Sequence, residues 1–182
     1  LYDLINHQGT VAAPLENNWE VEPGQLWAVG DHRLICGDLY DMLPGLMGDN
    51  QYDLLVTDPP YGVSYGDKQK ALQSVDRSGR RTEDIESDQD TTLWAKAFPM
   101  IALYATEGSS FYITAPPGPL SLDLRLALDD SGLTVRHILV WVKNRPVFSL
   151  GRLDCSYRHE HILYGWTEGS HVFMGQHESS VW

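Results

Sequence analysis

A proline pair behind a short apolar run constrains this chain more than any other feature, in the segment LLVTDPPYGVSY at residues 54–65. The run Leu-Leu-Val is continuous rather than alternating, which is typical of a strand buried on both faces of a parallel sheet. Proline has no N–H group and a fixed φ near about −65°, so Pro59 and Pro60 must end that strand. The backbone therefore leaves the strand by one stiff path, with its carbonyl groups free as acceptors.

Apolar strands and amphipathic helices alternate beyond this turn. The sequence predicts strands over 53–57, 109–116, 134–144 and 159–166. It predicts a first helix from about residue 91, despite Pro99. A second helix is predicted over 120–132, where Gly132 closes it. This alternation predicts an α/β fold with a mostly parallel sheet. The last two strands lack a helix between them, so we expect an antiparallel pair at one edge.

The segments before the first strand carry weaker patterns. Residues 1–22 are polar, residues 24–38 indicate two extended pieces with a turn at Gly30–Asp31, and residues 41–51 indicate a short helix or turn broken at Pro44–Gly45. We therefore expect an N-terminal extension over 1–23 and one domain over 24–182.

Composition excludes several classes of protein. The chain has 182 residues, 42% of them hydrophobic, but no run of about 18 apolar residues and no signal-peptide pattern, which predicts a cytoplasmic protein without a membrane partner. The two cysteines lack the spacing of a zinc site. His159 and His161 would share one face of a strand, but two ligands do not make a metal site, and we expect none.

Charge is unevenly distributed. A net charge of −12 alone argues against a nucleic-acid partner, yet ten of the thirteen Lys and Arg residues fall in two windows. These windows hold Lys68, Lys70, Arg77, Arg80 and Arg81, then Arg136, Lys143, Arg145, Arg152 and Arg158. The two segments 62–90 and 144–158 are therefore candidate phosphate-contacting loops.

The proline turn itself indicates a binding role. Ligands of parallel α/β sheets bind beyond the carboxyl ends of the strands, and Asp58 follows such an end. A carboxylate and a main-chain carbonyl held in fixed positions suit an amino group with two hydrogens to donate. From these residues alone, a turn that merely ends a strand is an equally good interpretation.

Several segments together resemble one family. TDPPYGVSY, the earlier HRLICGDLYDMLPGL, the later GSSFYITAPPG, and ILVWVKNRPVFSLGRLDCSYRHEHILYGW are similar, in this order, to elements of the beta class of S-adenosylmethionine-dependent DNA amino-methyltransferases. The resemblance covers residues 24–166. It implies a Rossmann-like methyltransferase sheet, S-adenosylmethionine as cofactor, and a flipped adenine in DNA as substrate, methylated at N6.

The resemblance also implies residue roles. Asp58, Pro59, Pro60 and Tyr61 would form the catalytic turn, with Tyr61 stacked on the base, while Asp38, Leu39 and Asp58 would contact the cofactor. The residues implied for DNA contact are Lys68, Lys70, Arg77, Arg80, Arg81, Lys143, Arg145, Phe148 and Arg152. Phe148 would fill the gap left by the flipped base.

One family element is not found. The beta class continues with a D-P-F-x-G-S-G segment that wraps the methionine part of the cofactor, and this sequence does not contain it. The resemblance therefore implies a partial catalytic domain over 24–182, with a second chain or a further C-terminal segment supplying the glycine-rich motif. The alternatives are N4-cytosine, RNA or protein-amide methylation, a non-catalytic DNA-binding remnant, or half of a split enzyme.

Overall fold

The computed structural model describes residues 20–61, 92–146, 154–173 and 175–182. The chain divides into two compact units, Leu1–Gly48 and Asp49–Trp182, and each is described here by itself. No helix in the described ranges is long and apolar enough to cross a membrane.

The described residues of the first unit, from 20 to 48, form a hairpin and one helix. Strands β1 (Leu26–Val29) and β2 (His32–Ile35) pair antiparallel around Gly30, whose φ of 61° suits the expected turn, and α1 (Leu39–Met47) follows. The predicted break at Pro44 is wrong, because α1 runs through it. A proline inside a helix removes one N–H donor and crowds the preceding turn, but its carbonyl still accepts, and the Pro44 carbonyl accepts from Gly48 N at 2.8 Å.

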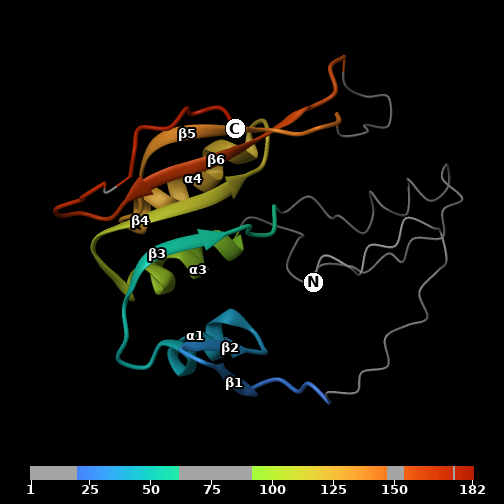
Figure 1. The fold of residues 1–182 in the computed structure, drawn as a ribbon. Coiled ribbons are helices and arrows are strands. Elements are labelled where there is room, and N and C mark those ends of the chain that lie inside the picture. Colours follow the sequence, from blue (N-terminus) through green and yellow to red (C-terminus); the bar gives the residue numbers. More distant parts are fainter. Residues whose placement is uncertain (1–19, 62–91, 147–153, 174) are drawn as a thin grey trace, which may run out of the picture. The chain divides into compact units, whose positions relative to one another are not determined.

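The second unit is built on a four-stranded sheet. Its strands are β3 (Tyr52–Thr57), β4 (Ala105–Ala115), β5 (Thr134–Val142) and β6 (His159–Trp166), in the order β3-β4-β6-β5 (Figure 1). β3 and β4 are parallel, while β6 is antiparallel to both β4 and β5. Three strands therefore share one direction, which confirms the α/β class and the antiparallel pair at one edge.

The helices α3 (Thr92–Ala102) and α4 (Leu120–Asp130) cover one face of this sheet (Figure 1). Alternate residues of β4 point to that face and are buried there, and the core consists of Trp94, Phe98, Phe111, Ile113, Ala115, Leu124, Leu128, Leu133 and Leu163. The expected closure of α4 at Gly132 is confirmed by its φ of 79° and by the bond from Leu133 N to Leu128 O at 2.9 Å.

The prediction that β3 is buried on both faces is wrong. Leu54 is 54% exposed and Val56 is 70% exposed, whereas Leu55 between them packs against the core. Within the described part of this unit, β3 is an edge strand that pairs with β4 alone, and the helices cover only the face that carries Leu55.

The buried residues between the sheet and the helices should contribute most to the stability of the second unit. Leu163 in β6 is fully buried, whereas Leu126 in α4 is 55% exposed. Leu163→Ala should lower the free energy of unfolding by about 2–5 kcal/mol, because it removes buried methyl groups and leaves a cavity. Leu126→Ala, the matched control, should change it by less than about 0.5 kcal/mol. Urea unfolding measures both, and equal losses would contradict this core.

Candidate functional site

The proline turn lies where three strands reach one edge of the sheet. Thr57 pairs with Ile113 in the parallel register of β3 and β4, so Asp58 and Thr114 follow side by side. β6 runs the other way and begins at this edge, where His161 pairs with Ala115. We call the residues at this place, 58–61, 114–117 and 159–161, the carboxyl edge.

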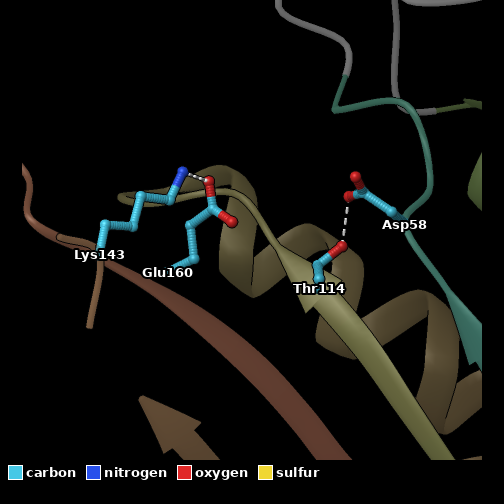
Figure 2. A network of polar contacts seen from close by, with 4 residues as sticks. All are labelled: Asp58, Thr114, Lys143 and Glu160. Atoms are coloured by element: carbon cyan, nitrogen blue, oxygen red, sulfur yellow. Dashed lines mark hydrogen bonds and ion pairs between the residues drawn. The ribbon is translucent and has the colours of Figure 1, made fainter. Parts of the chain in front are cut away.

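Figure 2 draws one polar contact within the carboxyl edge and a second one beside it. The Thr114 hydroxyl donates a hydrogen bond to Oδ1 of Asp58, whose side chain is otherwise exposed. Beside them, Lys143 forms an ion pair with Glu160. About a quarter of each charged side chain is exposed, so this pair is part-buried and holds the start of β6 against the end of β5.

Tyr61 completes the turn as a half-buried aromatic side chain. Burial raises the pKa of its phenol well above the ordinary value of 10.0. Hydrogen bonding with Thr114 lowers this pKa, while the neighbouring Asp58 and Glu160 carboxylates raise it, so Tyr61 lies close to all three. The phenol therefore stays neutral at physiological pH, and Tyr61 offers an uncharged ring beside the Asp58 carboxylate.

A buried tryptophan holds the turn from the helix side. The indole Nε1 of Trp94 in α3 donates to the Pro60 carbonyl at 2.9 Å. No hydrogen bond to the neighbouring Pro59 carbonyl occurs among the described residues. One carbonyl of the turn is therefore used to anchor it, and the other is left as an acceptor.

The sequence pattern predicted a helix from about residue 91 but not this anchoring contact of Trp94. The available signal was chemical, since the indole N–H of a buried tryptophan usually requires an acceptor. A carbonyl next to a proline is such an acceptor, because the missing proline N–H leaves the turn without its usual backbone pairing. The pattern could not show which carbonyl the indole would reach.

Of the cofactor residues implied by the resemblance, Asp38 and Leu39 lie in the first unit, whereas Asp58 lies in the second. Asp38 is the N-cap of α1, and its Oδ1 accepts from Tyr40 N at 2.8 Å. Leu39 is the first residue of α1 and is 37% exposed. The cap uses one carboxylate oxygen of Asp38 and leaves the second as a further acceptor.

The residues implied for DNA contact are only partly covered by the structure. Arg145 is exposed, and Lys143 is engaged with Glu160. The others fall outside the described residues: Lys68, Lys70, Arg77, Arg80, Arg81, Phe148 and Arg152.

A shallow pocket opens at the carboxyl edge, lined by Ala115, Pro117, His159, Glu160 and His161. Burial, and then the neighbouring His159, lower the pKa of His161 below its ordinary value of 6.5. The described residues contain no group of three or more His, Cys, Asp or Glu side chains that could hold a metal ion. The rings of His159 and His161 instead lie beside each other in a tilted arrangement, with centroids 5.2 Å apart.

No protein-family model matches this chain, and no curated protein matches it in sequence. Among solved structures, the M1.HpyAVI complex with S-adenosylmethionine is similar with a TM-score of 0.49 and 14% identity, over 72% of this chain and 54% of that one. TTHA0409 from Thermus thermophilus, named as a candidate DNA modification methylase and complexed with S-adenosyl-L-methionine, is similar with a TM-score of 0.45 and 17% identity, over 77% and 55%. This chain spans about half the length of the solved structures it matches.

The lowered pKa of His161 predicts a pH-dependent stability. The unfolded chain binds the proton first as pH falls, so protonation favours unfolding. The contribution of neutral His161 is complete above pH 6.5 and is lost as pH falls through the lower folded-state pKa. Wild type should therefore lose more unfolding free energy between about pH 8 and about pH 5 than His161→Gln does.

Urea unfolding at both pH values measures this difference. His32→Gln is the control, because it removes an exposed imidazole from the first unit. A wild-type pH response that His161→Gln leaves unaltered would contradict the assignment to His161.

Proposed function

We propose that the protein is an S-adenosylmethionine-dependent DNA methyltransferase that methylates the exocyclic N6 amino group of a flipped adenine. The observation that carries this proposal is the Asp58 to Tyr61 turn at the carboxyl edge, with an oriented carboxylate, a Pro59 carbonyl that no described residue engages, and a neutral aromatic ring. The DPPY sequence of this turn resembles the family's catalytic motif, and its place directly after strand β3 supports that likeness.

The chemistry of an exocyclic amine explains these residues. Its lone pair is delocalised into the base ring, so the nitrogen is a poor nucleophile. The Asp58 carboxylate and the Pro59 carbonyl each accept one N–H hydrogen bond, which favours a pyramidal nitrogen with a localised lone pair. When bound, S-adenosylmethionine would supply the methyl group, and its sulfur would leave with the bonding electrons as the amine nitrogen takes the methyl. The proton that nitrogen loses leaves beside Asp58, which is exposed to solvent.

Tyr61 binds the base rather than the reacting atoms. An adenine within a stacked duplex is out of reach, so it must leave the helix to contact the turn. Stacking on an aromatic ring contributes about 1–3 kcal/mol per base in single-strand binders. A neutral phenol suits this role, because a phenolate beside the Asp58 carboxylate would add a second negative charge to the site.

Asp38 and Leu39 are the proposed contacts for the adenine part of the cofactor. The carboxylate of Asp38 keeps an acceptor oxygen after capping α1, which fits the amino group of that ring, and Leu39 offers an exposed apolar side chain beside it. Residues that hold the methionine part are proposed to come from a glycine-rich segment beyond those in this sequence, on this or another chain. Lys143 and Arg145, with the basic and aromatic residues of the two loops, are the proposed DNA contacts.

Substitution of Asp58 tests the mechanism. Asp58→Ala in the full-length protein should lower methyl transfer to unmethylated duplex DNA by about 100-fold or more, because an acceptor aimed at the reacting amine is lost. Transfer of a labelled methyl group measures the rate, and nucleoside chromatography after digestion identifies the methylated base. Asp53→Ala is the matched control, since Asp53 lies at the other end of the same strand and bonds to Thr106 at 2.8 Å.

The outcomes separate the alternatives. Full activity of Asp58→Ala would overturn the assigned mechanism. Label in N4-methylcytosine would replace adenine by cytosine as the target, and competition with RNA or peptide would reveal a different substrate class. Absence of transfer by the wild-type protein to all of these would favour a non-catalytic module.

A further inference from the structure

We propose that Thr114 is a positioning residue that sets the orientation of the Asp58 carboxylate and so determines which oxygen faces the substrate amine. The inference rests on the proposed function and extends it to a residue outside the DPPY turn. Its basis is the hydrogen bond between a strand hydroxyl and the side chain assigned to grip the amino group.

The Asp58 side chain needs such a partner. It is exposed, and an ionised carboxylate has about four acceptor sites on two equivalent oxygens, so its orientation depends on its hydrogen-bond partners, which are Thr114 and the neighbouring Tyr61. Thr114 engages Oδ1, and Figure 2 shows the second oxygen pointing away from Thr114. A hydroxyl bound to a charged acceptor makes one of the stronger hydrogen bonds in proteins, so this contact favours one orientation over the others.

The donor is itself held firmly. Thr114 lies between two neighbouring strands, because Ile113 pairs with Thr57 of β3 and Thr114 pairs with Ile162 of β6. Its β-branched side chain is stiff at χ1, and it lies between Ile113 and Ala115, which are both buried in the core. A group on a regular element positions a reacting partner more accurately than one on a loop does.

In this arrangement, the two oxygens of the Asp58 carboxylate have different roles. Oδ1 accepts from Thr114, and the second oxygen accepts from the substrate amine together with the Pro59 carbonyl. Loss of the Thr114 hydroxyl leaves the charge of Asp58 in place but removes the strand donor, so that Tyr61 alone orients the carboxylate and holds it less firmly. Orientation matters most in the transition state, so the expected defect is in kcat rather than in KM for DNA.

Two substitutions of Thr114 and one matched control test the proposal in the full-length protein. Thr114→Val keeps the shape and β-branching but removes the hydroxyl, and kcat should fall about 10- to 100-fold with KM for DNA unchanged. Thr114→Ser keeps the hydroxyl and should restore most of kcat. Thr106→Val removes the equivalent bond from β4 to Asp53 of β3 at the far end of the same strand pair, and kcat should stay at the wild-type value.

A measurement without turnover accompanies the kinetics. The side-chain carboxyl carbon of Asp58 is followed by NMR and is identified by its disappearance in Asp58→Asn. Thr114→Val should shift this resonance, whereas Thr114→Ser and Thr106→Val should leave it near its wild-type position.

The results discriminate between this inference and the function on which it rests. An active Thr114→Val with wild-type kcat, or equal losses in the Val and Ser variants, would overturn the positioning role alone. An unmoved Asp58 resonance in Thr114→Val would overturn the contact itself. A wild-type protein that methylates no DNA would overturn the proposed function, whatever the resonance shows.

Discussion

The parallel pairing of β3 with β4 is the constraint on which the rest of the candidate site depends. Its register places Thr57 opposite Ile113, so both strands end together and Asp58 follows beside Thr114. A slip by one residue would turn Leu55 away from the core and separate the hydroxyl from the carboxylate. The same register buries Phe111 and Ile113 under the helices. The register of β3 with β4 therefore determines both the packing of the core and the geometry of the site.

The turn after β3 shows how absent hydrogen-bond donors can organise a site. Two consecutive prolines bring two carbonyl groups and no N–H into the turn, which leaves acceptors in excess. Trp94 uses the Pro60 carbonyl from the buried side, and the Pro59 carbonyl is not engaged by a described residue. A turn with this arrangement is stiff, is anchored to the core and still presents an acceptor to an amino group.

Sequence patterns predicted much of the fold, and their errors have physical reasons. The antiparallel pairing of β5 with β6 followed from the missing helix between them, and the end of α4 followed from Gly132. Pro44 did not end α1, since a proline costs a helix one donor while its carbonyl still accepts. The apolar residues of β3 gave no sign that Leu54 and Val56 are exposed, because the exposure of a strand residue depends on which elements pack against the strand.

The sequence by itself determined the kind of chemistry available: a carboxylate and two proline carbonyls at a strand end, followed by an aromatic ring. It also determined the strand and helix order, because apolar periodicity and glycine or proline positions are local properties of the chain. Only the tertiary structure decided which side chains serve that turn. Trp94 lies 34 residues from Pro60 in the chain, and Thr114 lies 56 residues from Asp58. Hydrogen bonds over such separations form only once strand register and helix packing have brought their donors to the turn.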